Sequence, residues 1–481
     1  MLKSRLCIAF FAFAVGCAPA QKPLTDYVNP MLGTATLWDS VDLGFKPTKR
    51  TWGAEVFPGS SLPNAMVQVS PVTKFHSGAG YQYEDSVIYG FTHTNKGHWN
   101  LCHIPLLPVT GTPTPGDYCS PFSHERESAA PGYYQVFLDR YGVDAQLSST
   151  LRCAFHKYTY PAGAAASLLA DLQRSNEHVR AWDIRKEGDN VFAGWQQTGE
   201  KMYFYAVANR PVTGIEPVVE GDREVRIVRF GEGDGALELR IGFSFVSEKN
   251  ARENLEAEML GKSFAEVRSE ATATWNDLLG RIRVEGGTER EKGLFYSSLY
   301  RSFLWPALRS DVNGEFTDVD GKVINPGFRY YTGPSYWDDY RNKLILLGML
   351  APDVAADVIS SDTDKGEKRG GFMPTFFHGD HASAFVAGTY LRGNRGFDVN
   401  RAYNLVLRNA TVQGPSRPWL DEYIAKGYIS EMDVENPVTW TVCKAAVTKT
   451  LEYSYDDYAV ALLADALGDK ENHDMLMKRT S

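Results

Sequence analysis

The sequence predicts a multidomain β + α protein, in which an antiparallel β-sandwich is followed by helices. A change of pattern along the chain leads to this prediction. From residue 23 to about 247, short apolar runs alternate with clusters of glycine, proline, asparagine and aspartate. Beyond residue 249, apolar residues recur at helical spacing and long glycine- and proline-rich loops separate the helical segments. Paired helices with such loops gathered at one end are typical of an α/α toroid.

Length and composition limit the classes of function. A chain of 481 residues allows about two to four domains. Hydrophobic residues make up 43% and aromatic residues 12%, which predicts a folded globular chain. The formal net charge is −9 and no block of Lys and Arg occurs, so we expect no nucleic-acid partner.

The first 20 residues predict an export signal, because a basic start precedes an apolar segment, residues 6–15, that is too short to span a bilayer. Two processing sites compete. Residues 14–17, Ala-Val-Gly-Cys, resemble a bacterial lipoprotein box with lipidation at Cys17, whereas residues 18–20, Ala-Pro-Ala, fit a site that releases a soluble protein. We favour lipidation. It predicts a periplasmic or outer-membrane lipoprotein of a Gram-negative bacterium, with membrane contact only through this anchor.

Residues 22–248 are predicted to form the β-sandwich. The clearest strand is residues 237–245, where every second side chain is apolar. Further strands are expected at residues 133–138, 202–208 and 225–230.

A helical linker is predicted over residues 249–287 and a toroid domain over residues 288–481. Residues 251–282 have helical spacing, and a longer helix is expected over residues 289–308. The apolar faces of these two helices are expected to carry Trp275, Leu278, Leu279, Ile282, Leu294, Tyr296, Leu299 and Phe303.

Two further helices are predicted in the toroid. One runs through Leu344, Leu347 and Met349 and stops at Pro352. The other covers residues 445–467, with Gly468 as its C-terminal stop.

The stretch 331–342 combines a Gly-Pro turn with an aromatic side chain, two carboxylates and a guanidinium, from Trp337, Asp338, Asp339 and Arg341. An aromatic face beside fixed carboxylates suits a sugar, whose ring stacks on Trp and whose hydroxyls donate to Asp. The alternative is a helix N-terminus, at which acidic side chains complement the dipole and need no ligand.

Three other loops concentrate polar, aromatic and glycine residues: 51–59, 90–100 and 376–382. The last of these carries Asp380 and His381, which we interpret as partners for hydroxyls or water. His93, His98 and His103 fit no standard zinc spacing, so local hydrogen bonding is the simpler interpretation.

The sequence excludes several other chemistries. It holds no nucleophile elbow, Walker A loop or Rossmann glycine fingerprint. Cys102, Cys119, Cys153 and Cys443 lack C-x-x-C pairing and are expected to be buried thiols, although an oxidising compartment also allows one disulfide among the first three.

Several stretches match a known family in order along the chain. They are residues 27–30, 57–71, 88–94, 295–301, 336–341, 378–382 and 449–457, which include Phe-Pro-Gly-Ser-Ser, Tyr-Trp-Asp-Asp-Tyr-Arg and His-Gly-Asp-His-Ala. Together they resemble glycoside hydrolase family 92, the bacterial exo-acting α-mannosidases. The resemblance implies an N-terminal β-sandwich, a helical linker and an (α/α)6 barrel.

The resemblance also implies an activity: hydrolysis of α-mannosides with inversion, aided by bound Ca²⁺ and acting on mannose-containing oligosaccharides of the N-glycan or mannan type. It places Trp337, Asp338, Asp339, Arg341, Asp380 and His381 in the sugar-binding wall, and suggests that His93 and Trp99 reach the ligand from the sandwich.

The sequence departs from the family at the catalytic groups. The family's acid segment, of the type Glu-Gly-Asn-Ala-Trp-Gln-Tyr, and its base segment, of the type Asn-Asp-Asp-x-Gly-Gln, are both absent. We therefore expect an incomplete barrel that is truncated before these segments, with the principal calcium ligands beyond Ser481, and we assign no catalytic or metal-binding residue. The alternative is a non-catalytic homologue or a carbohydrate-binding surface protein.

Overall fold

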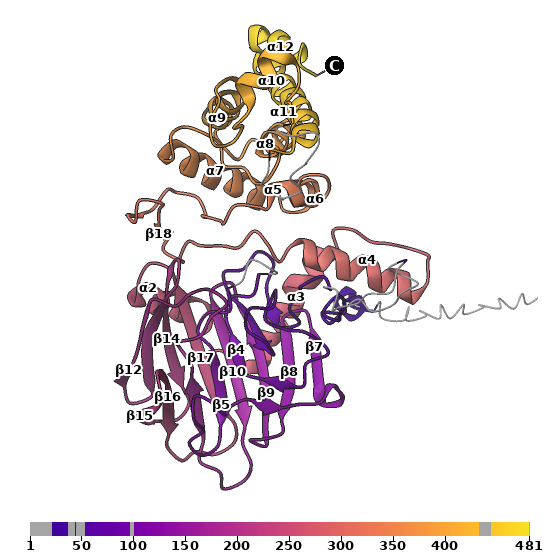
Figure 1. Ribbon diagram of the computed structural model, residues 1–481. Helices are drawn as coiled ribbons and strands as arrows, with labels where there is room; N and C mark the ends of the chain where they lie inside the picture. Colours follow the sequence, from indigo (N-terminus) through magenta and orange to yellow (C-terminus); the bar gives the residue numbers. More distant parts are fainter. Residues whose placement is uncertain (1–21, 37–43, 45–52, 97–100, 432–443, 481) are drawn as a thin grey trace, which may run out of the picture.

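The computed structural model describes residues 22–36, 44, 53–96, 101–431 and 444–480. A two-sheet sandwich forms one half of the molecule and a helical domain forms the other, with α3 and α4 beside their junction (Figure 1). The predicted fold class of a β-sandwich followed by helices is confirmed.

The sandwich consists of two antiparallel sheets. In spatial order, the seven-stranded sheet comprises β1 (Ser60–Ser61), β2 (Gln68–Val72), β4 (Gly90–Thr92), β5 (Leu106–Val109), β11 (Ser167–Ala170), β16 (Arg223–Phe230) and β15 (Val212–Glu220). The eight-stranded sheet comprises β12 (Ala181–Gly188), β13 (Val191–Gln197), β14 (Lys201–Ala208), β17 (Leu237–Ser244), β10 (Cys153–Thr159), β9 (Val143–Ser149), β8 (Tyr133–Leu138) and β7 (Glu127–Ala130).

The four expected strands correspond to β8, β14, β16 and β17. Buried side chains alternate with less buried ones along β14 and in the first half of β17, as expected where one face of a strand packs against the opposite sheet. The second half of β17 is buried on both faces, because Gly242 also lies against Ala251 and Leu255 of α2. Two short two-stranded sheets, β3 (Val87–Ile88) with β6 (Ser120–Pro121) and β18 (Phe316–Thr317) with β19 (Val323–Ile324), lie outside these sheets. Two single turns of 3-10 helix, η1 (Leu24–Tyr27) and η3 (His124–Arg126), complete this half.

The linker contains two helices where the sequence predicted one over residues 251–282. They are α2 (Glu248–Glu258) and α3 (Phe264–Leu279), and the break holds Gly261 at φ +92°. The new helix begins at a capping box, in which Ser263 and Glu266 each accept a hydrogen bond from the other's backbone N–H. The prediction of a single helix is therefore wrong at this point.

The next helix, α4 (Glu289–Ser302), is shorter than the predicted 289–308. Pro306 cannot donate a helical hydrogen bond, and the residues after Ser302 turn toward the sandwich. Leu294, expected on the buried face, is 41% exposed, whereas Tyr296 and Leu299 are buried as predicted.

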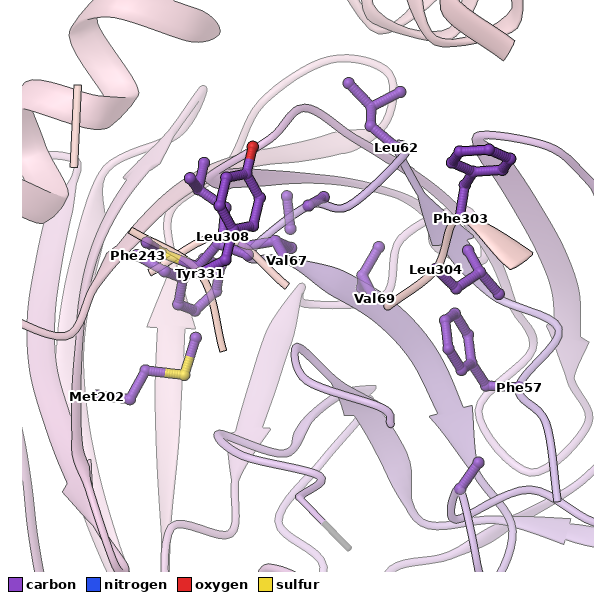
Figure 2. Packing of buried hydrophobic residues seen from close by; sticks show 14 of the residues in the cluster. Phe57, Leu62, Val67, Val69, Met202, Phe243, Phe303, Leu304, Leu308 and Tyr331 are labelled. Atoms are coloured by element: carbon purple, nitrogen blue, oxygen red, sulfur yellow. The ribbon is translucent and has the colours of Figure 1, made fainter. Parts of the chain in front are cut away.

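The sandwich and the helical domain share one hydrophobic core. Phe303, Leu304, Leu308 and Tyr331, which connect α4 to the helical domain, lie among sandwich side chains (Figure 2). The sandwich side chains labelled there are Phe57, Leu62, Val67, Val69, Met202 and Phe243.

Polar contacts reinforce this junction. The Arg152 guanidinium donates to the Ser310 carbonyl at 2.8 Å and pairs with Glu258 at 2.7 Å. The Asp311 carboxylate accepts from Ser244 and Asn254, each at 2.7 Å. The strand ends of the sandwich are therefore bound directly to the segment that enters the helical domain.

The helical domain comprises α5 (Tyr336–Asp339), α6 (Lys343–Leu350), α7 (Pro352–Lys368), α8 (Ala382–Leu391), α9 (Val399–Thr411), α10 (Leu420–Lys426), α11 (Ala446–Leu467) and α12 (Lys470–Met477). The predicted C-terminal stop is confirmed, because α11 ends at Gly468 with φ +83°. Pro352 not only follows α6 but also opens α7 as its first residue. Met349 lies on the outside of α6 and is 62% exposed.

The apolar side chains of α11 are not all buried. Val447, Leu451, Tyr455 and Tyr458 are 75%, 67%, 45% and 43% exposed, and their spacing places them along one side of the helix. Among the described residues no single helix is long and apolar enough to cross a membrane; α6 and α7 reach that length and composition only together and are bent by 119°.

Candidate functional site

The turn around Trp337 forms the short helix α5, on the side of the helical domain that faces the sandwich (Figure 1). The Asp339 carboxylate accepts a hydrogen bond from the Ser335 backbone N–H at 3.2 Å and pairs with Lys343 at 3.1 Å. Asp339 therefore fits the alternative interpretation of this turn, in which an acidic side chain stabilises a helix N-terminus without a ligand. Asp338 is exposed on the same turn.

Trp337 and Arg341 lie at an aromatic surface. The Trp337 ring meets Phe377 edge-on with centroids 5.8 Å apart, and His378 is at 6.2 Å. The Arg341 guanidinium lies 5.6 Å from the Trp337 ring centroid and 4.6 Å from that of Tyr340. The Trp337 Nε1 is buried and has no hydrogen-bond partner among the residues described here. Two predicted loops, 331–342 and 376–382, therefore meet at this surface.

Behind this surface, Asp380 is fully buried and bound from three sides. Its carboxylate accepts hydrogen bonds from Ser383 and Asn409, each at 2.8 Å, and from Arg417 at 3.3 Å. Burial raises the pKa of Asp380 to about 7, although the Arg417 charge opposes this shift. The structure therefore places Asp380 behind the aromatic surface, where its carboxylate holds Ser383, Asn409 and Arg417.

His381 is also fully buried. Its Nδ1 lies 2.9 Å from Asp456, its Nε2 lies 3.3 Å from Glu452, and its ring stacks on Tyr340 with centroids 3.7 Å apart. Burial disfavours the imidazolium, but the hydrogen bond to Asp456 and the charges of Asp456 and Glu452 outweigh it, so the pKa of His381 is raised. His381 therefore holds Tyr340 in place from behind and is not part of the exposed wall.

The groups that hold Asp380 and His381 in place were not predicted from the sequence. Glu452 and Asp456 are four residues apart on α11, so they share one face of that helix, a spacing that the sequence already contained. Arg417 pairs with Asp457 at 2.5 Å and lies in a loop without any distinguishing pattern. Its role could not have been read from the sequence.

On the sandwich side, the prediction that His93 reaches the ligand is wrong. His93 is fully buried, with Nδ1 2.9 Å from the Ile104 carbonyl and Nε2 3.0 Å from His156 Nε2. Burial lowers the pKa of His93 to about 3. Both ring nitrogens are thus occupied in the sandwich core. Trp99, the other predicted residue, lies outside the described residues.

Lys96, from the same loop as His93, is a sandwich residue that the structure does place at the junction. Its Nζ lies 3.9 Å above the Trp305 ring, and the Trp305 Nε1 donates to the Gly333 carbonyl at 3.2 Å. Burial and the charges of Lys343 and Arg309 lower the pKa of Lys96 to about 7, and Asp338 and Asp339 oppose this shift. Lys96 is therefore close enough to Asp338 and Asp339 for their charges to affect its pKa.

His103 is held by local hydrogen bonds, and the cysteines among the described residues are free thiols. His103 is bound to Thr94 at 2.7 Å and Thr198 at 2.9 Å, which agrees with local hydrogen bonding, and His98 lies outside the described residues. Cys102 and Cys153 are buried free thiols and Cys119 is a half-buried one, so the alternative of a disulfide among these three is wrong. Cys443 and the predicted lipidation site Cys17 lie outside the described residues.

The wall does not by itself fit a calcium site. Within the described parts of the chain, no group of three or more His, Cys, Asp or Glu side chains is placed to hold a metal ion. Asp339, Asp380 and Asp457 already pair with Lys343 or Arg417. Calcium would require hard oxygen donors that are not committed to cations in this way.

Comparison with known proteins gives a consistent result. Residues 27–253 match the glycosyl hydrolase family 92 N-terminal domain, and residues 250–481 match the glycosyl hydrolase family 92 catalytic domain. A family GH92 α-mannosidase from Bacteroides thetaiotaomicron superimposes with a TM-score of 0.85 at 27% identity, over 95% of this chain and 65% of that one. It has also been solved in complex with mannoimidazole.

Two further relatives are more distant. An inverting mannosidase of the same family from Bacteroides thetaiotaomicron VPI-5482 shares the fold, with a TM-score of 0.82 at 24% identity over 96% of this chain and 65% of that one. An uncharacterized secreted glycosidase of Arthroderma benhamiae is 24% identical over 94% of this chain and 61% of its own length. The chain thus spans 61–65% of the length of these relatives.

Proposed function

Because the chain belongs to glycosyl hydrolase family 92, we propose that it takes part in the hydrolysis of α-mannosides. We further propose that it binds the terminal mannose of a glycan at the surface formed by Trp337, Asp338 and Arg341, which we call the Trp337 wall. The observation that carries this proposal is the meeting of loops 331–342 and 376–382 at the domain junction. There Trp337 offers an aromatic face, Asp338 a carboxylate and Arg341 a guanidinium beside one another. Sugars are bound by such combinations of an apolar face and a few polar groups.

The finer features of the activity are also proposals. Inversion at the anomeric carbon and exo action rest on the family resemblance. In inverting enzymes an acid and a base lie roughly 6.5–9.5 Å apart on opposite sides of the sugar. We assign neither role to a described residue. Calcium dependence is likewise proposed on the resemblance alone, and no catalytic step is derived through the ion.

Binding and hydrolysis can be tested separately. Calorimetric titration with methyl α-mannoside should show binding, and α-mannobiose supplied with calcium should be hydrolysed to mannose. Replacing Trp337 by Leu should weaken mannoside binding about threefold to tenfold through loss of the aromatic face. Tyr428→Leu, at an exposed tyrosine after α10, is the matched control. Undiminished mannoside binding by Trp337→Leu would place the sugar elsewhere.

A second candidate function is carbohydrate binding without catalysis. It is favoured by the ion pairs of the carboxylates around the wall, since Asp339, Asp380 and Glu452 all face cationic or histidine partners. Mannoside binding with no release of mannose, at any calcium concentration, would select this alternative. Loss of all release on adding a chelator, with recovery on adding calcium, would support the catalytic proposal and its calcium dependence together.

We also propose that the protein is exported and tethered through Cys17. The leader pattern supports this, and a relative is described as secreted. Metabolic labelling with a radioactive fatty acid should mark the wild-type protein but not Cys17→Ala. Labelling that persists in this variant would contradict the proposal.

A further inference from the structure

A hollow of about 400 Å³ lies on the helical domain, where the loop after β19 meets α7 and the start of α9. Its lining includes Phe328, Thr363, Arg395, Phe397, Asp398 and Arg401. We refer to it as the α7–α9 hollow. Its volume lies within the roughly 300–1,000 Å³ that is usual for ligand sites.

Two aromatic rings form walls of the α7–α9 hollow. Phe328 is half-buried and ends a row of rings, because it stacks on Tyr330 at a centroid distance of 6.1 Å and Tyr330 stacks in turn on Phe316. Phe397 is 9% exposed and belongs to the main hydrophobic core. Both rings are held by their neighbours, so this apolar surface is formed before any ligand arrives.

Three polar side chains of the α7–α9 hollow have unused hydrogen-bonding capacity. Asp398 caps α9 with Oδ1, which accepts from the backbone N–H groups of Asn400 and Arg401 at 3.1 Å, and its Oδ2 has no partner in the described ranges. The Arg401 guanidinium donates to Glu367 through Nε and Nη2, at 2.9 and 2.6 Å, and its Nη1 has no partner there either. Thr363 is 3% exposed, and its Oγ1 lacks a hydrogen-bond partner among the described residues.

The Thr363 hydroxyl is the observation that points to a ligand. A buried hydroxyl without a hydrogen bond lowers stability, and a threonine in a helix commonly avoids this by donating to the carbonyl four residues earlier. Thr411 on α9 does so, with its hydroxyl 2.7 Å from the Leu407 carbonyl. Thr363 does not, although it lies inside α7. A partner from outside the chain would satisfy it.

The charges around the α7–α9 hollow favour a neutral ligand. The charge of Arg401 is balanced by Glu367, and Arg395 and Asp398 carry opposite charges. Because neither sign is in excess, an ion would gain little. A sugar ring has an apolar face that suits Phe328, and its hydroxyl groups both donate and accept hydrogen bonds.

Helix α7 separates this hollow from the Trp337 wall. Asp362 accepts a hydrogen bond from the hydroxyl of Tyr336, the residue before Trp337, whereas the next residue on α7, Thr363, lines the hollow. Successive residues of an α-helix point in directions about 100° apart. The α7–α9 hollow is therefore a separate site and not a part of the wall.

We propose that the α7–α9 hollow is a second sugar-binding site, which holds one pyranose unit of a neutral mannan chain. In this arrangement the apolar face of the sugar lies on Phe328, and its hydroxyl groups donate to Asp398 and accept from Arg401 and Thr363. The identity of the sugar as mannose rests on the proposed function. Two sites on one chain would hold a polysaccharide more tightly than either site alone.

The test is electrophoresis of the folded protein through native gels that contain soluble α-mannan, which retards a protein that binds it. Asp398→Asn keeps the helix cap, because asparagine caps a helix as well as aspartate does, but it removes the charge that accepts the sugar hydroxyls. This variant should bind mannan about threefold to tenfold more weakly than the wild type. Asp469→Asn, at the N-cap of α12, is the matched control and should bind as the wild type does.

A second pair of variants tests the buried hydroxyl. Thr389 on α8 is 2% exposed, and its Oγ1 also lacks a partner among the described residues, but it does not line the hollow. Neither Thr363→Val nor Thr389→Val should lower stability in urea unfolding, since each removes an unpaired hydroxyl with little change of shape. Only Thr363→Val should weaken the binding of mannan.

Each result has a definite meaning. Mannan binding that is unchanged in Asp398→Asn or in Thr363→Val, or that is weakened equally in the control variants, overturns the second site and leaves the proposed function intact. Weaker binding in both variants, with unchanged binding in Trp337→Leu, supports the second site and contradicts mannose binding at the Trp337 wall. A wild-type protein that mannan does not retard overturns both.

Discussion

Replacing Arg417 by Met should destabilise the protein strongly and in a pH-dependent manner. Arg417 is fully buried between two fully buried carboxylates, 2.5 Å from Asp457 and 3.3 Å from Asp380. Its removal leaves Asp457 with Arg479 at 3.7 Å and leaves Asp380 with only neutral donors. Breaking a buried ion pair from one side costs about 3–5 kcal/mol, so we expect about 4 kcal/mol at pH 8.

The direction of the pH dependence follows from Asp380. Its pKa in the folded protein is raised to about 7, so the folded state binds its proton more tightly than the unfolded state, whose pKa is near 4. This group therefore lowers the stability progressively as the pH rises from about 4 to 7. Without Arg417 the pKa rises further, so the loss of stability should be clearly smaller at pH 5 than at pH 8.

Urea unfolding followed by circular dichroism at both pH values measures these effects. Arg401→Met is the matched control, because Arg401 pairs with Glu367 at 2.6 Å but both side chains are partly exposed, and it should cost at most about 1 kcal/mol. A loss below about 1 kcal/mol for Arg417→Met, or an equal loss at both pH values, would refute the assignment of Arg417 as the main counter-charge of this cluster.

Three further outcomes are expected. Trp275→Leu should cost about 3 kcal/mol in urea unfolding, because the fully buried indole also donates to the Ser61 carbonyl at 2.7 Å; a loss under about 1 kcal/mol would contradict this. Gly132→Ala should lower the free energy of unfolding by about 2–4 kcal/mol, because the new Cβ would lie 2.5 Å from the Ala271 Cβ and the backbone has a φ of +78°. Gly163→Ala, where φ is similar but the Cβ would meet nothing within 4 Å, should lower it clearly less. The exposed apolar side of α11, on which Leu451 is 67% exposed, should make the protein self-associate, and Leu451→Lys should reduce this association in light scattering. No association of the wild type, or unchanged association of the variant, would contradict this.

Part of the sandwich could be predicted from local patterns, because strands such as β14 have one buried and one less buried face. The alternation in residues 237–245 therefore gave the extent of β17 to within one residue. The break between α2 and α3 was missed although Ser263 and Glu266 form a recognisable capping box. The early end of α4 depends on where its following residues pack, which is a property of the whole fold.

The site could be predicted only in part. Loops 331–342 and 376–382 were expected to contribute, and the structure brings them together around Trp337. The burial of His93 could not be foreseen, because its partner His156 lies 63 residues away on β10. The same holds for Arg417, whose two carboxylate partners come from different parts of the chain.

The shared core in Figure 2 has a consequence for how the molecule unfolds. Phe303, Leu308 and Tyr331 belong to the helical side of the chain but occupy space inside the sandwich. Removing the helical domain would therefore open voids in the sandwich, and unfolding it would expose the same apolar surface from both sides. The two domains are thermodynamically coupled, so they should melt in one cooperative transition rather than as independent units.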